Sequence, residues 1–126
     1  MTTLDDIRQI CAKLPGAVEG EGRFGFSVEV KGKAKGFLWS WLERVEPKKA
    51  RVVNEGVIAI VVPNLTAKEL IKESNPPYWV EDPHYNGYPA IIVRLSHIKP
   101  EEIEDLIIEG WRAKASKQLL AQWVEN

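Results

Sequence analysis

The run Val57–Val62, with the sequence VIAIVV, decides the fold that we expect for this chain. All six residues are apolar, so a strand formed by them needs cover on both faces, which is typical of a central strand. Asn54-Glu55-Gly56 is predicted to turn the chain before this strand, and Pro63 is predicted to end it. A short strand over Arg51–Val53 is expected just upstream.

A β-hairpin is predicted before the central strand. Alternating apolar residues favour a first strand over Phe24–Val30 and a second over Lys35–Leu42, and Lys31-Gly32-Lys33 joins them as a tight turn. Three aromatic residues of the second strand are expected to share one face and to anchor the sheet against helices: Phe37, Trp39 and Trp41.

Two helices are predicted in the first two thirds of the chain. Thr2 or Thr3 caps the first, which stops at Pro15-Gly16 and is followed by a loop over Ala17–Gly22. Its apolar stripe includes Cys11, which we interpret as a core residue because no base is placed beside it. Thr66 is expected to cap a short second helix, with Glu69 completing a capping box.

A longer helix is predicted at the end of the chain. Pro100 is suited to its first turn, and acidic residues crowd the same turn, as the helix dipole prefers. One long apolar face follows: Ile103, Leu106, Ile107, Trp111, Ala115, Leu119 and Trp123. Gly110 and Ser116 are weak points where the helix could bend or end.

The order of these elements predicts an α+β fold. Strands that adjoin in sequence, with helices grouped at the ends, indicate a two-layer sandwich with a mostly antiparallel sheet. The length of 126 residues suits a single domain over residues 1–126.

The composition limits the cellular compartment and the binding partners that we expect. The chain has one cysteine, which excludes an internal disulfide and fits a cytoplasmic protein. No apolar run approaches the ~20 residues of a membrane helix, and the first residues lack a basic secretory signal. The formal net charge of −1 provides no overall attraction to nucleic acid, so binding to DNA would need a local basic patch.

The stretch Asn75–Leu95 (NPPYWVEDPHYNGYPAIIVRL) predicts a strand, a loop and a second strand. Tyr78–Val80 and Ala90–Leu95 favour strands, and turn dipeptides favour a tight loop over Pro83–Gly87. We call Pro83–Tyr88 the aromatic tip. It is either a plug that closes one end of the core or a binding site carried by a rigid scaffold.

The sequence resembles the MmcQ/YjbR family in two places. The segment LPGAVEGEGRFGFSVEVKGKAKGFLW, from Leu14 to Trp39, is similar to the front of that family, and PHYNGYPAIIVRLSHI, from Pro83 to Ile98, is similar to a subgroup of it. Ala115-Ser116 departs from the Ala-Pro that is usual in the subgroup. The resemblance implies the CyaY-like fold of the bacterial frataxins, with helices on one face of the sheet, and a DNA-binding role.

A basic segment carries the DNA-binding hypothesis. Lys31–Arg51 holds seven basic and two acidic residues, a local net charge of +5. Such a wing could contact phosphates, and an exposed Trp39 or Trp41 could stack on a base. The alternative is that the lysines only keep a hairpin soluble. The predicted contact residues are Lys31, Lys33, Lys35, Arg44, Lys48, Lys49 and Arg51.

The aromatic tip carries the alternative hypothesis, a module that binds an unidentified ligand or protein. Glu81 and Asp82 precede it, and the predicted binding residues are His84, Tyr85, Asn86, Tyr88 and Arg94. His84 is the residue here that would titrate near neutral pH. A surface histidine in a structural turn is the simpler interpretation.

No catalytic motif can be assigned. The sequence has no nucleophile elbow, phosphate-binding loop, CxxC or HExxH arrangement, so we expect a non-enzymatic protein without a cofactor or metal. The acidic residues after Pro100 are explained by the helix dipole, and His97 has no second ligand nearby in sequence. The sequence does not predict an oligomeric state.

Overall fold

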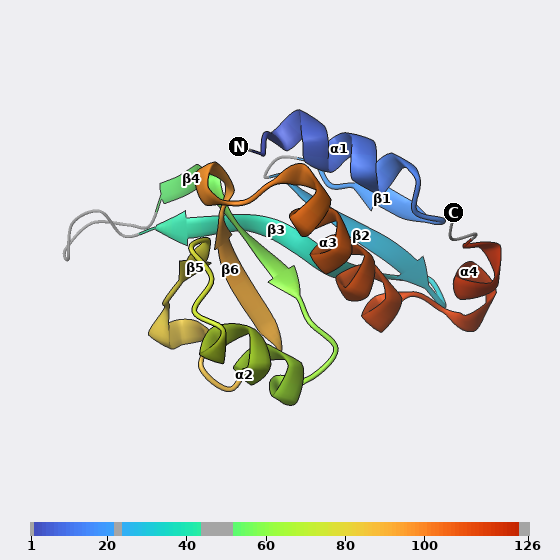
Figure 1. Cartoon of the computed structure of the whole chain (residues 1–126). Helices are drawn as coiled ribbons and strands as arrows, with labels where there is room; N and C mark the ends of the chain where they lie inside the picture. The colour runs from blue at the N-terminus through green and yellow to red at the C-terminus, as the bar shows by residue number, and fades with distance from the viewer. Residues whose placement is uncertain (1, 22–23, 44–51, 124–126) are drawn as a thin grey trace.

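The structure, a computed structural model, describes residues 2–21, 24–43 and 52–123, with the side chains of residues 41–43, 52–55 and 84 left out (Figure 1). The elements in chain order are α1 (Leu4–Ala12), β1 (Ala17–Glu19), β2 (Gly25–Val30), β3 (Lys33–Glu43), β4 (Val52–Val61), α2 (Leu65–Glu73), β5 (Trp79–Val80), η1 (Pro83–Tyr85), β6 (Ala90–Arg94), η2 (Leu95–His97), α3 (Pro100–Lys114) and α4 (Lys117–Gln122).

The six strands form one sheet in the order β1-β2-β3-β4-β6-β5, and each neighbouring pair is antiparallel. β4 lies inside the sheet, and every residue of Val57–Val62 is at most 3% exposed. The prediction of a central strand buried on both faces is therefore confirmed.

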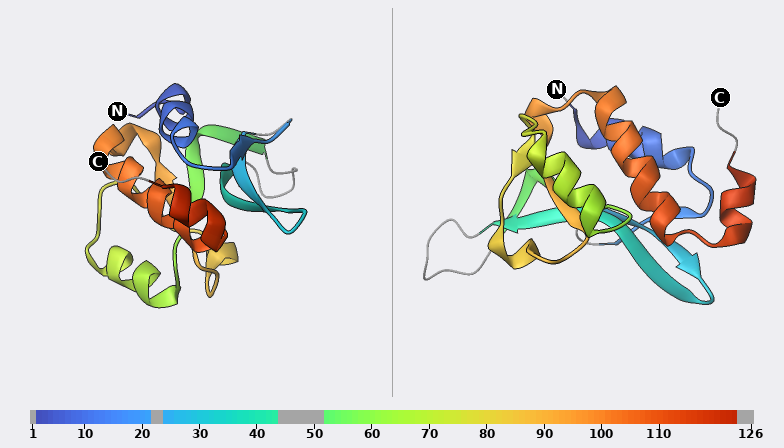
Figure 2. Two further views of the ribbon diagram at one scale, coloured as in Figure 1. Left: turned by 90° about the vertical axis from the view of Figure 1, so that its right-hand side faces the viewer. Right: turned by 60° about the horizontal axis from the view of Figure 1, so that its bottom comes forward.

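The helices lie on one side of the sheet (Figure 2). On that side, Ile58 and Ile60 of β4 share one core with residues of α1 and α3. The fully buried helical members of this core are Ile7, Ile103, Ile107 and Trp111. The α+β sandwich with an antiparallel sheet is thus the observed fold class. We call the side of the sheet away from the helices the second face.

Two predicted boundaries were wrong. Ala17–Glu19, expected in a loop, forms β1, because it finds a partner in β2 with Ala17 opposite Val28. Asn54-Glu55-Gly56 does not turn the chain but lies within a continuous β4. The register jumps there, with Ser40 opposite Ile58 and Trp41 opposite Asn54, so the extra residues form an irregular bulge.

The predicted cap of α1 is confirmed, whereas the predicted cap of α2 was wrong. Thr3 caps α1 and exchanges hydrogen bonds with Asp6, which confirms the first prediction. Asn64, not Thr66, caps α2: its Oδ1 accepts a hydrogen bond of 2.8 Å from the amide of Ala67. An asparagine two residues earlier provides the same acceptor, so α2 begins at Leu65.

The predicted aromatic face of β3 is interrupted. Phe37 has no partner on β2, because Phe26 pairs with Leu38 and the next residue, Ser27, pairs with Gly36. This bulge buries both Phe37 and Leu38 completely and leaves Trp39 on the second face. Trp39 therefore does not pack against the helices, and the side chain of Trp41 lies outside the described residues.

α3 runs straight through Gly110, which was expected to be a weak point. A Cβ atom at this position would lie 2.6 Å from the carbonyl oxygen of Val61 and 3.4 Å from Cγ2 of Ile60. The glycine thus permits the closest approach of the helix to the sheet. The break predicted at Ser116 is real, because its hydroxyl caps the separate helix α4.

No helix within residues 2–21, 24–43 and 52–123 is long and apolar enough to cross a bilayer.

We predict that Gly110→Ala destabilises the protein by about 2 kcal/mol. The added methyl group meets a backbone carbonyl that cannot move alone, and overpacking of this kind costs ~1–3 kcal/mol. The higher helix propensity of alanine offsets at most ~1 kcal/mol of this cost. Urea unfolding measures the change, with Glu109→Ala on the exposed side of the same helix as a control. Equal or greater stability of Gly110→Ala would show that the helix and sheet are not in close contact here.

Candidate functional site

Three of the predicted DNA-contact residues lie together on the β2–β3 hairpin. Lys31, Lys33 and Lys35 are exposed. Lys31 and Gly32 have φ values of 53° and 79°, which suit the tight turn of a type I′ hairpin. Within the described part of the chain, none of the three ammonium groups has a carboxylate within ion-pairing distance. Their charges face solvent.

The other four predicted contact residues, Arg44, Lys48, Lys49 and Arg51, lie outside the described residues. Glu43, the residue before the segment that contains them, ends β3 on the side opposite the hairpin (Figure 1). Lys33 and Glu43 are separated by ten residue steps, about 33 Å along a straight strand. The hairpin lysines are therefore well separated from the residue at which this segment begins.

Beyond Ser40, β3 and β4 continue as a pair without the neighbouring strands. Trp41–Glu43 pairs with Val52–Asn54. β2 is paired with β3 only as far as Trp39, and β6 is paired with β4 only as far as Val57. We call the paired segments Trp41–Glu43 and Val52–Asn54 the β3–β4 ribbon. It extends beyond the six-stranded part of the sheet (Figure 1).

The aromatic tip folds back onto the second face of the sheet. The hydroxyl of Tyr85 accepts a hydrogen bond of 2.9 Å from the indole Nε1 of Trp39. The ring of Tyr88 meets those of Trp39 and Tyr85 edge to face, with centroids 6.5 and 6.1 Å apart. Trp39 is half-buried by this cluster and does not present a free ring to a nucleic-acid base. The tip thus has the packing role of a plug.

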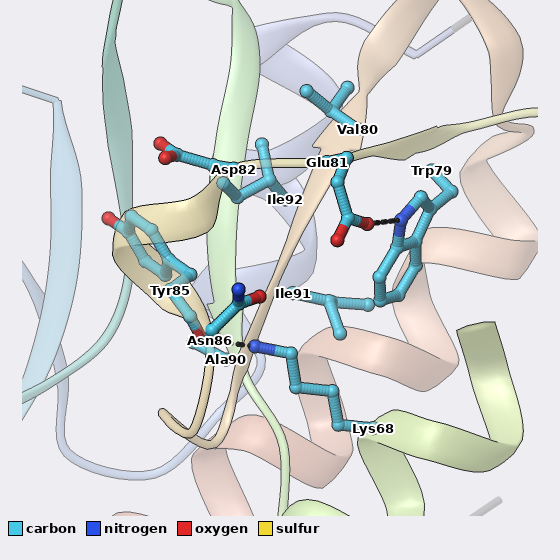
Figure 3. Close-up of a pocket in the computed structure, with 10 residues that line it drawn as sticks. All are labelled: Lys68, Trp79, Val80, Glu81, Asp82, Tyr85, Asn86, Ala90, Ile91 and Ile92. Carbon is cyan, nitrogen blue, oxygen red and sulfur yellow. Dashed lines mark hydrogen bonds between the residues drawn. The ribbon is translucent and has the colours of Figure 1, made fainter.

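Lys68 on α2 holds the aromatic tip in place, and sequence reasoning missed it. Its Nζ donates to the carbonyl oxygen of Tyr85 at 2.5 Å (Figure 3) and to that of Tyr88 at 2.9 Å. The side chain is buried, with 9% of the residue exposed. Burial lowers the pKa of Lys68 from its ordinary value, and the charges of Glu81 and Glu69 oppose this shift. A lone lysine in an amphipathic helix gives no sequence signal for such a contact.

A small pocket lies between Lys68 and the aromatic tip. Asp82, Tyr85 and Asn86 line one side of it, and Trp79 and Ile91 lie on the other (Figure 3). Its free volume is about 10 Å³, about what one water molecule needs. Ligand pockets are typically ~300–1,000 Å³, so this pocket is too small for a small-molecule ligand.

The remaining predicted tip residues are dispersed. Tyr88 and Arg94 are exposed and do not line the pocket, and the side chain of His84 lies outside the described residues. Glu81 accepts a hydrogen bond of 2.7 Å from the indole of Trp79, which lowers the pKa of its carboxyl group. Lys72, 3.6 Å away, lowers that pKa further. The structure therefore brings Tyr85 and Asn86 together with Lys68 rather than with Arg94.

One serine–histidine contact lies elsewhere on the surface. The hydroxyl of Ser96 is 2.8 Å from Nδ1 of His97, and both residues are exposed. In the described chain no carboxylate is bound to His97, and no group of three or more possible metal ligands occurs. Without an orienting acid or a cleft, this pair does not form a catalytic centre.

The chain has relatives of unknown role. No family model matches it. Uncharacterized proteins of Mycobacterium tuberculosis (strains ATCC 25618 / H37Rv and CDC 1551 / Oshkosh) and Mycobacterium bovis are each 33% identical over 70 residues, which is 56% of this chain and 54% of each relative. The chain thus spans about half the length of the curated relatives it matches.

A solved structure shares the fold. The DUF419-domain protein DR2400 of Deinococcus radiodurans superimposes with a TM-score of 0.65 at 18% identity, over 97% of this chain and 88% of that protein. At this identity the likeness concerns the fold alone.

Cys11 lies in the core, separate from the tip and the hairpin. It is 1% exposed. Burial, followed by the charge of Glu19, raises the pKa of its thiol from 9.0 to about 12. A thiol with this pKa stays protonated at neutral pH, so the interpretation of Cys11 as a core residue agrees with its surroundings.

We predict that Cys11 makes the protein less stable as the pH rises above about 9. The unfolded thiol ionises near 9.0 and the folded thiol near 12, so the unfolded state loses its proton first and is favoured between these values. Urea unfolding of wild type and Cys11→Ala at pH 8 and pH 10.5 measures this effect. The stability advantage of the wild type should shrink by ~2 kcal/mol at the higher pH. An unchanged difference would show that the folded thiol ionises normally.

Proposed function

We propose that this chain is a non-enzymatic DNA-binding protein of the MmcQ/YjbR type, which contacts DNA mainly at the β3–β4 ribbon. The ribbon is the observation that carries the proposal. A two-stranded β-ribbon fits the major groove of B-DNA, and several DNA-binding proteins use strands in this way. Residues 44–51, which join the two strands of the ribbon, include four basic residues and one acidic residue.

The family assignment in this proposal rests on two supports. The Pro83–Pro89 motif (PHYNGYP) resembles a subgroup of the MmcQ/YjbR family. The DUF419 domain of the structural neighbour is related to MmcQ/YjbR-type folds. Neither support identifies a DNA sequence, so the proposed contacts are to the phosphate backbone, as their basic side chains favour.

The hairpin lysines provide a second proposed contact. Lys31, Lys33 and Lys35 carry charges that no neighbouring carboxylate neutralises. The length of β3 from Lys33 to Glu43, about 33 Å if straight, is close to the ~34 Å of one DNA turn. The two ends of β3 thus have a spacing suited to phosphates on successive turns of one side of a duplex.

Protein binding by the aromatic tip stays the second candidate. Tyr88 is 44% exposed although its neighbours in the cluster are half-buried. Exposed tyrosines are common in protein–protein interfaces, because one ring offers both apolar area and a hydroxyl group. This candidate uses a surface that does not include the ribbon, so the two proposals can be separated by mutation.

We predict micromolar binding to duplex DNA at about 50 mM salt, with affinity falling steeply by about 200 mM salt. The logarithm of the binding constant should fall with the logarithm of salt concentration with a slope of about −0.9 per phosphate contacted. Fluorescence anisotropy with labelled duplex and single-stranded DNA measures both quantities. Absence of binding at micromolar protein and low salt would contradict the proposal.

Charge reversal tests where the DNA lies. Changing Lys31, Lys33, Lys48 and Lys49 to glutamate should abolish binding, because phosphates then meet negative charge on the hairpin and in the segment 44–51. The matched control changes the same number of charges elsewhere, at Lys99, Arg112, Lys114 and Lys117. This control should bind DNA more tightly than the first variant, although the two variants have the same net charge. Equal loss in both variants would show that only overall charge matters.

A further inference from the structure

The aromatic tip is joined to the rest of the protein by few contacts. Among its side chains described, Tyr85 is half-buried, whereas Asn86 and Tyr88 are exposed. Two internal backbone hydrogen bonds shape it, from Asn86 to Pro83 and from Tyr88 to Tyr85. Segments with little buried apolar surface open at a lower free energy than the core of a protein. The aromatic tip buries little apolar surface, so it is expected to open at a lower free energy than the core.

Apolar residues of the sheet lie behind the tip. Ala90 and Ile92 line the same small pocket as Tyr85 and Asn86. Ala59 pairs with both Ile92 and Trp39 on the second face, and it is completely buried. These residues belong to the side of the sheet that has no helix layer. Their burial therefore depends on the tip and on Trp39, not on α1 or α3.

Lys68 is well placed to hold the tip closed. It lies on α2 and reaches two carbonyl groups three residues apart, those of Tyr85 and Tyr88. Each carbonyl also accepts a backbone hydrogen bond, from Tyr88 and Ala90 respectively, so the lysine bonds to groups that already fix the turn. Hydrogen bonds from an ammonium group are about twice as strong as neutral ones.

The geometry points to a local opening of the aromatic tip that is controlled by Lys68. In the closed state the Lys68 ammonium and the Trp39–Tyr85 hydrogen bond keep the aromatic tip, residues 83–88, on the second face, while the hydrogen bond of 2.9 Å from the amide of Val62 to the carbonyl oxygen of Pro89 holds the chain after the tip to β4. When the Lys68 and Trp39 contacts break, the tip leaves as a unit and uncovers Trp39, Ala59 and Ile92, while the helix-side core stays intact. The fold thus contains a cover over an apolar surface, and one buried cation closes it.

Amide hydrogen exchange by mass spectrometry tests this inference. In Lys68→Met the apolar stem remains but both donors to the carbonyl groups are lost. Exchange of the amides of residues 84–88 should rise at least tenfold, while exchange of Val57–Val62 should change less than twofold. Binding of a fluorescent apolar dye should increase in parallel. Tyr85→Phe, which removes only the bond to Trp39, should give a smaller increase in the same segment.

Lys72→Met is the matched control. Lys72 lies on the same helix and pairs with Glu81, but it is exposed and contacts neither tip carbonyl. It should leave exchange in residues 84–88 unchanged. A tenfold rise in this control would show that the charge of α2, rather than the Lys68 contacts, closes the tip. No rise in Lys68→Met, or an equal rise in Val57–Val62, would overturn the inference.

The wild-type protein provides a test that does not require Lys68→Met to fold. Exchange of residues 84–88 should be insensitive to low urea concentrations, as expected for a small local opening, whereas exchange of Val57–Val62 should accelerate with urea. If both segments respond to urea alike, the tip opens only by global unfolding and the inference fails.

Discussion

Burial of residues 57–61 of β4 on both faces is the constraint on which the rest of the structure depends. Ile58 and Ile60 face the helices, and Ala59 between them faces the other way, yet all three are inaccessible to solvent. An antiparallel sheet usually leaves one face to water. Here α1 and α3 cover one side, and the other side is covered where it is most apolar by Trp39 and the aromatic tip. The tip thus completes the fold.

The sequence predicted the elements better than their boundaries. The VIAIVV run could be placed at the centre of the sheet, because a strand that is apolar on both faces needs cover on both faces. Thr3 and Pro100 marked helix starts through local hydrogen bonding and backbone geometry, which act over three or four residues. β1 and the bulge at Glu55–Gly56 depend instead on a partner strand, and a partner's register is not readable from local pattern.

The candidate site was likewise only partly predictable from the sequence. The sequence showed which residues make up the aromatic tip, but it did not show that the tip folds onto the second face of the sheet. The role of Lys68 could not be predicted, because a lysine in an amphipathic helix is normally solvated. Its role depends on the distance between α2 and a loop some twenty residues later. The bulge at Phe37 likewise moved Trp39 to the second face, which changed it from an expected helix anchor to the partner of Tyr85.

The outermost strands of the sheet are very short. β1 has three residues and β5 has two, whereas the inner strands β3 and β4 have eleven and ten. An outer strand exposes unpaired amide and carbonyl groups that can template the addition of another chain. Borders only two or three residues long offer too few such groups for a stable intermolecular ladder. The outer strands β1 and β5 therefore provide little template for edge-to-edge growth of fibres from the apolar sheet.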